Sequence, residues 1–230
     1  MNTSLLRLPF LLSATYGVHK SMTPPHLAPA EERLPIKGPD IERAAPAFAI
    51  FTKVTFYLLC ATETLAILSA NDLLPIRYVP LHLMPSLNLP LRLTKPYLFF
   101  WSCTILGSSL RMCCYRIMSS FFTFELSIRK DHKLITQGPY SIVRHPSYVG
   151  AMLCGIGAVG SHLSRGSWLS NWINITPVGW LSAWTFTMAL IRIALVPRMN
   201  KEDKMLKDAF GKEWEDWAQR VPYRLIPWVY

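Results

Sequence analysis

The side chains best suited to binding or catalysis gather in one short stretch, from Gly138 to Gly150. It opens with a Gly-Pro turn signal and carries two tyrosines, Tyr140 and Tyr148, and two adjacent basic residues, Arg144 and His145. An apolar run follows directly, and polar groups at the edge of such a run are costly unless they have a partner or a function. The stretch is therefore either a binding site at a membrane surface or a plain anchor, with cations facing lipid phosphates and tyrosines at the interface.

A second candidate follows the last apolar run, where Arg198 and Glu202 are four residues apart and Asp203 comes next. On a helix this spacing places Arg198 and Glu202 on the same face. Such a pair is either an ordinary surface ion pair, worth about a few tenths of a kcal/mol, or a paired site. In the second case the cation would hold an anionic substrate and the carboxylate a cationic one.

Two further patterns have a structural and a functional interpretation. Glu125 follows a block of aromatic residues and is either a helix-end charge or a carboxylate facing a cationic ligand among the rings. Residues 155–160 match the Gly-x-Gly-x-x-Gly pattern of dinucleotide-binding loops. Because the match lies inside an apolar run, where a helix uses the backbone N–H groups, we reject that function. Small residues that let helices pack closely are the better interpretation.

Composition indicates a membrane protein with several spans. The 230 residues are 51% hydrophobic and only 17% charged, whereas soluble domains are about 25% charged. The net charge of +10 comes from cations at the ends of apolar runs, which is typical of basic cytosolic loops and does not favour nucleic-acid binding. The five cysteines lie in apolar runs without a Cys-x-x-Cys pair, so we expect neither disulfides nor a metal site.

We expect an all-α, polytopic transmembrane protein with about four to five spans and an amphipathic C-terminal helix. Residues 71–96 are predicted to form a broken loop, because Pro75, Pro80, Pro85 and Pro90 follow one another closely. Pro197 is predicted to end the last span, and basic residues place the connector 123–148 and the tail 198–230 together in the cytosol. The expected spans are 47–70, 97–122, 149–163 and 175–196.

Ordered motifs connect the two candidate sites. They are His132-Lys133-Leu134-Ile135, Gly138-Pro139-Tyr140, Arg144-His145-Pro146-Ser147-Tyr148-Val149-Gly150, Arg198-x-x-x-Glu202-Asp203-x-x-Leu206, Phe210-Gly211-x-x-Trp214 and Arg220-Val221-Pro222. In this order they resemble the isoprenylcysteine carboxyl methyltransferase family, over roughly residues 97–230. The Arg-His-Pro-x-Tyr element alone is shared with other small membrane methyltransferases. The family usually has Glu-Glu where this chain has Glu202-Asp203, which is a mild departure.

The resemblance implies an S-adenosylmethionine-dependent enzyme of the endoplasmic reticulum membrane, with its site facing the cytosol. The implied substrates are prenylated protein C-termini, whose cysteine carboxylate receives the methyl group. By resemblance, Arg198 binds the substrate and Arg198 and Glu202 act in catalysis. The positions implied to contact the cofactor are Glu125, His132, Lys133, Leu134, Ile135, Tyr140, His145, Pro146, Ser147, Tyr148 and Glu202.

The chain is accordingly divided into three parts. Residues 1–46 form an N-terminal linker or interfacial segment, residues 47–122 form transmembrane helices and the proline-rich loop, and residues 123–230 form the catalytic region with a cytosolic cofactor-binding connector. Two alternatives remain open. One is a phospholipid or other small-lipid methyltransferase, and the other is a catalytically inactive membrane scaffold.

Overall fold

A computed structural model describes residues 4–26, 41–75, 91–124, 132–173 and 176–229. Within these ranges every regular element is helical, which confirms the all-α prediction for the described part of the chain. The elements are α1 (Arg7–Ser21), α2 (Ile41–Ala70), α3 (Lys95–Met118), η4 (Ser119–Phe121), η5 (Gly138–Ser141), α4 (Pro146–Leu163), α5 (Trp168–Trp172), α6 (Pro177–Phe210) and α7 (Lys212–Arg220).

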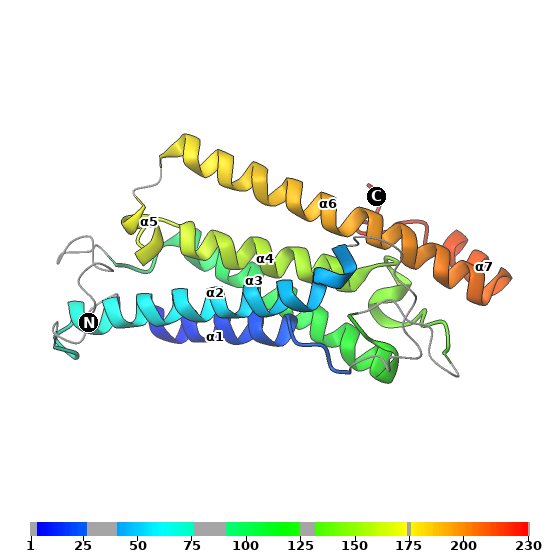
Figure 1. Ribbon diagram of the computed structural model, residues 1–230, viewed down its shortest axis with the longest axis horizontal. Helices are drawn as coiled ribbons and strands as arrows, with labels where there is room; N and C mark the ends of the chain where they lie inside the picture. The colour runs from blue at the N-terminus through cyan, green and yellow to red at the C-terminus, as the bar shows by residue number, and fades with distance from the viewer. Residues whose placement is uncertain (1–3, 27–40, 76–90, 125–131, 174–175, 230) are drawn as a thin grey trace.

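Helices α1 to α4 form an elongated bundle, and the long helix α6 runs above it towards α7 (Figure 1). Two described helices, α2 from Pro46 and α6, are long and apolar enough to cross a membrane. The expected second and third spans correspond to α3 and α4, which begin and end a few residues from the predicted bounds. The figure of four to five spans stays a prediction. Residues 76–90 of the proline-rich loop lie outside the described ranges.

Glycines allow α3 and α4 to pack with their backbones in contact. A Cβ atom on Gly107 of α3 would lie 2.3 Å from the backbone nitrogen of Cys154, and one on Gly157 of α4 would lie 2.4 Å from that of Thr104. This confirms that the small residues at 155–160 serve helix packing, with one exception. Gly155 has no neighbour within 4 Å of the position a Cβ would take. Close packing of α3 fixes the direction in which α4 presents its N-terminal turn.

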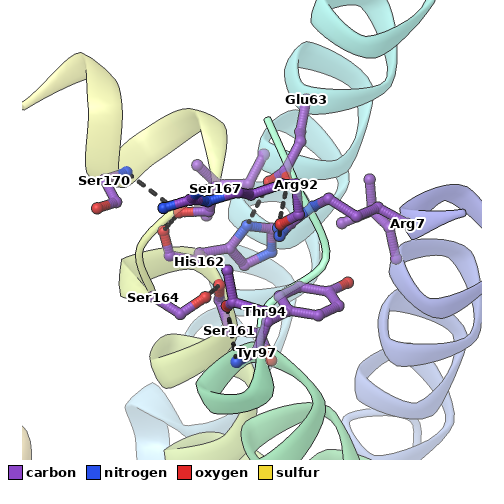
Figure 2. A network of polar contacts seen from close by, with 12 residues as sticks. Arg7, Glu63, Arg92, Thr94, Tyr97, Ser161, His162, Ser164, Ser167 and Ser170 are labelled. Atoms are coloured by element: carbon purple, nitrogen blue, oxygen red, sulfur yellow. Dashed lines mark hydrogen bonds and ion pairs between the residues drawn. The ribbon is translucent and has the colours of Figure 1, made fainter. Parts of the chain in front are cut away.

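Helix α1 differs from the expected linker or interfacial segment, because residues 7–21 pack into the bundle. Arg7 is fully buried and its guanidinium binds the Glu63 carboxylate of α2. It also donates to the carbonyl oxygen of Arg92 and lies 3.8 Å from the centre of the Tyr97 ring. Glu63 in turn lies 3.5 Å from Nδ1 of His162 in α4, so one polar network joins α1, α2, α3 and α4 (Figure 2).

Helix α6 continues through Pro197, so the prediction that this proline ends the span is wrong. A proline inside a helix costs about 3 kcal/mol because it removes one hydrogen bond and crowds the preceding turn. Contacts made just beyond it offset that cost, since Met199 is fully buried and Asp203 is nearly so. The helix ends instead at Gly211, whose φ of +52° suits glycine, and α7 starts at the next residue.

Candidate active site

The stretch that joins η5 to α4 is held by the C-terminal tail. Pro146 occupies the first turn of α4, where its missing N–H costs nothing. Just before it, the backbone N–H groups of Arg144 and His145 donate to the carbonyl oxygens of Tyr223 and Arg224, each at 2.9 Å. The tail after α7 therefore pairs with residues 144–145 by backbone hydrogen bonds. The two segments that carry the candidate residues meet at the start of α4.

Tyr148 joins Arg198 and Glu202, which lie on one face of α6. Its hydroxyl donates to Oε2 of Glu202 at 2.7 Å and accepts from Nε of Arg198 at 2.8 Å. A terminal nitrogen of Arg198 also donates to the carbonyl oxygen of Phe124. Burial, and then the negative charge of Glu202, raises the pKa of Tyr148 above its usual range. The phenol therefore stays neutral and acts as a hydrogen-bonding bridge between a cation and an anion.

His145 is oriented by Asp203. Its Nε2 lies 3.0 Å from Oδ1 of Asp203, and its Nδ1 lies 3.8 Å from Oε2 of Glu202. Arg144 and Arg224 face the other oxygen of Asp203, at 3.7 and 3.2 Å. Burial alone would raise the pKa of Asp203, but the bond from His145 and the two arginines hold that pKa below its usual value. An ionised carboxylate only accepts hydrogen bonds, so it places a proton on Nε2 of His145.

Apolar and aromatic side chains form the support beneath these polar groups. Tyr140 is buried, its hydroxyl donates to the sulfur of Met118 at 2.9 Å, and its carbonyl accepts from Nε1 of Trp217 at 3.2 Å. Leu134 and Ile135 pack against the same cluster. The ring of His132 stacks on Phe121, with centroids 4.8 Å apart. Leu134, Ile135 and Tyr140 therefore share an apolar cluster with Trp217 of α7.

The structure places the residues expected from the sequence in three groups. The first group, His145, Tyr148, Arg198 and Glu202, is joined by hydrogen bonds and by the 3.8 Å contact between His145 and Glu202. In the second group Leu134, Ile135 and Tyr140 share one apolar cluster, His132 stacks on Phe121 and Pro146 begins α4, while Lys133 is exposed. Ser147 forms the third group, because it is buried and its hydroxyl faces Arg111 of α3. Glu125 lies outside the described residues.

Three residues of the site were given no role from the sequence: Phe124, Arg224 and Arg111. Asp203 was named there beside Glu202, but its contact with His145 was not predicted. The three residues act through contacts between residues 21 to 90 positions apart, which no local pattern reveals. Within the described ranges, no group of three His, Cys, Asp or Glu side chains is arranged to hold a metal ion.

Residues 100–208 match the model of the isoprenylcysteine carboxyl methyltransferase family. A relative from Arabidopsis thaliana named protein-S-isoprenylcysteine O-methyltransferase B is 32% identical over 120 residues, which is 51% of this chain and 53% of the relative. A Dictyostelium discoideum relative named protein-S-isoprenylcysteine O-methyltransferase is 30% identical over 132 residues, 55% of this chain and 49% of the relative. The chain thus spans about half the length of these relatives.

A protein of another class also matches. The Schizosaccharomyces pombe protein named delta(14)-sterol reductase erg24 is 27% identical over 106 residues, which is 46% of this chain but 21% of that protein. The matched region thus occurs in proteins with different names, and it makes up a far smaller share of the reductase than of the methyltransferases.

Proposed function

We propose that this chain, whose residues 100–208 match the model of the isoprenylcysteine carboxyl methyltransferase family, methylates the C-terminal carboxylate of a prenylated cysteine. The methyl donor is S-adenosylmethionine. The substrates are processed proteins whose last residue carries a farnesyl or geranylgeranyl group. The match to the family and the names of the two methyltransferase relatives support this reaction.

The observation that carries the proposal is the junction of α4 with α6. Tyr148 of α4 binds both Arg198 and Glu202 of α6, and His145, just before α4, faces Asp203 of α6. These three contacts join two segments about fifty residues apart inside the part of the chain that matches the family. They place a guanidinium, a neutral phenol and carboxylates side by side at the polar end of two apolar helices.

The residues present fit the proposed donor. Glu202 offers a carboxylate that is 26% exposed at its side chain, so it can accept hydrogen bonds from an amino or ribose group. The rings of His145 and Tyr148 lie 5.5 Å apart, and aromatic faces attract cations. When bound, S-adenosylmethionine supplies an electrophilic methyl group on a sulfonium. We assign Tyr140, His145 to Tyr148 and Glu202 to the donor side, with residues 132–135 and Glu125 as further proposed contacts.

Arg198 is assigned to the acceptor. A guanidinium has five N–H donors in a planar fork, so it can hold a carboxylate while Tyr148 and Phe124 fix its plane. The acceptor carboxylate has a pKa of about 3.5 and is already ionised at neutral pH. No general base is needed, and the site contributes by aligning the reacting groups and excluding water. Arg198 orients the nucleophile, and Glu202 holds the donor.

The proposed substrate also accounts for the apolar helices. A prenyl chain gains about 0.8 kcal/mol for each CH₂ that leaves water, so it stays in hydrocarbon. An enzyme at the bilayer surface can receive its cysteine without extracting the chain. We propose that the protein lies in the endoplasmic reticulum membrane with this site facing the cytosol. Support comes from the family and from the basic residues beside the site, such as Arg144 and Arg224.

The direct test is transfer of labelled methyl from S-adenosylmethionine to N-acetyl-S-farnesylcysteine by the purified chain in lipid. Phosphatidylethanolamine serves as the competing acceptor, because an amine nucleophile would indicate a phospholipid methyltransferase. The methyl ester of N-acetyl-S-farnesylcysteine is the matched control, since it keeps the prenyl group and lacks the free carboxylate. We expect label on the acid alone. Label on the amine lipid and none on the acid would contradict the proposal.

A further inference from the structure

Arg111 is a buried cation near the middle of α3 that neither candidate motif includes. Its side chain is only 8% exposed, and a buried charge is costly unless its N–H groups are satisfied. Every described hydrogen bond that it makes leads away from α3's own backbone. The guanidinium therefore connects α3 to other parts of the fold.

The first connection is to the start of α4. A terminal nitrogen of Arg111 donates to the backbone oxygen of Ser147 at 3.2 Å and to its hydroxyl at 3.1 Å. Ser147 lies between Pro146 and Tyr148, so fixing its backbone and side chain fixes the turn that presents Tyr148. Because two acceptors of one residue bind one guanidinium, Ser147 is held in both position and rotation.

The second connection is to α1. Nε of Arg111 donates to the carbonyl oxygen of Ser21, the last residue of α1, at 2.6 Å. The same nitrogen lies 2.6 Å from the hydroxyl of Tyr115, which itself donates to Ser21 at 2.6 Å. A cation at this end of α1 also suits the negative end of the helix dipole. Helix α1 lies outside the family match, so this anchor is a property of the chain's own N-terminal part.

The third connection is to Phe124. Its ring centre lies 5.1 Å from the guanidinium carbon of Arg111, and its carbonyl oxygen accepts from Arg198. Arg111 therefore contacts both neighbours of the proposed site, Ser147 on the donor side and Phe124 on the acceptor side. It touches neither Tyr148 nor Arg198 in any described contact, and acts on them through these neighbours.

We propose that Arg111 is a positioning residue for methyl-donor binding, which uses the C-terminal carbonyl of α1 as its anchor and sets the geometry of Ser147 and Phe124. The inference rests on the proposed function. Removing the guanidinium frees the first turn of α4, so the loss falls mainly on donor affinity. The methyl-transfer step is affected less, because Arg198 and Glu202 keep their direct contacts with Tyr148.

The test measures S-adenosylhomocysteine binding by titration calorimetry, together with kcat and KM for S-adenosylmethionine, on the full chain in lipid. For Arg111→Met we expect Kd and KM to rise about ten-fold, as for the loss of a charged hydrogen-bonding partner, with kcat within about three-fold. Arg111→Lys keeps the cation without the fork, and should recover part of the affinity. Tyr115→Phe removes one hydroxyl from the anchor and should raise Kd about two-fold.

Arg7→Met is the matched control. Arg7 is also a buried arginine that connects α1 to another helix, but it is the first residue of α1 and lies about 21 Å from Ser21 at 1.5 Å per residue. We expect it to lower the melting temperature and leave Kd unchanged. If Arg7→Met raised Kd as much as Arg111→Met, general loosening of the bundle would explain both, and the inference would be wrong.

Two other outcomes would overturn the inference. One is wild-type donor affinity in both Arg111→Met and Tyr115→Phe. The other is a fall of kcat as large as the expected rise in KM, with KM itself unchanged. If Arg111→Met cannot be purified, Arg111→Lys and Tyr115→Phe still test the inference. Both retain most of the buried volume, so both are expected to fold. If the wild-type chain neither bound S-adenosylhomocysteine nor transferred methyl, the proposed function would be wrong. If the wild-type chain were normal and the variants behaved like it, only the inference about Arg111 would be wrong.

Discussion

Replacing Tyr148 by phenylalanine is the smallest change that separates α4 from the charged residues of α6. The ring stays in place and only the hydroxyl is lost. That hydroxyl binds Glu202 at 2.7 Å and Arg198 at 2.8 Å, so one atom's removal breaks the bridge between the two. Because the pKa of Tyr148 is raised, the wild-type group is a neutral phenol, and the change alters no charge.

The expected size of the effect follows from these two contacts. A hydrogen bond to a charged group contributes about 1.5–3 kcal/mol. Glu202 is 26% exposed at its side chain, so water can replace part of what is lost. Arg198 and Glu202 are also one turn apart and can pair directly. We therefore expect a total loss of about 1.5–2.5 kcal/mol, or roughly a 10- to 70-fold rise in the donor dissociation constant.

Calorimetric titration with S-adenosylhomocysteine measures this change, and KM for S-adenosylmethionine provides a second readout. Tyr57→Phe is the matched control, because its hydroxyl bonds to Nδ1 of His19 in α1, and neither residue belongs to the candidate site. We expect that variant to bind the donor within about two-fold of wild type. Equal affinities for Tyr148→Phe and wild type would refute the assignment of Tyr148 to the donor site.

Three further predictions concern other parts of the molecule. Arg198→Ala should lower methyl transfer at least about 100-fold, as for a lost orienting contact, while S-adenosylhomocysteine still binds; equal loss of both would contradict its role at the acceptor. Glu63→Leu should destabilise the protein by about 3–5 kcal/mol by stranding buried Arg7, and Arg7→Met in the same chain should restore most of it; chemical denaturation of both variants decides. Gly157→Ala should lower the melting temperature far more than Gly155→Ala, because only Gly157 contacts the α3 backbone.

The candidate site was predictable where residue type and local spacing carry the chemistry. Arg198 and Glu202 share a face of α6 as their spacing requires, and both meet Tyr148 from the Arg-His-Pro-x-Tyr element. The contacts that hold this group together were not predictable. Backbone hydrogen bonds from Arg144 to Tyr223 depend on how the tail folds back, and a single sequence carries no record of such pairing.

The errors in the fold have the same cause. Pro197 is unfavourable inside a helix when its neighbours are considered alone, but buried Met199 and Asp203 outweigh that local cost. Arg7 and Glu63 each stand in an apolar stretch of the sequence, where a single charge is unfavourable. Each is the other's buried partner, 56 positions apart, so neither could be understood separately.

Because α6 is one continuous helix, its two halves are mechanically coupled. None of its described side chains between residues 177 and 196 is buried, so this half of α6 contacts the surroundings of the protein. The same unbroken helix carries Arg198 and Glu202, which contact Tyr148 at the start of α4. Pro197 is the place where this helix can bend. A displacement of the outer half would therefore be transmitted along the helix to the residues that contact Tyr148.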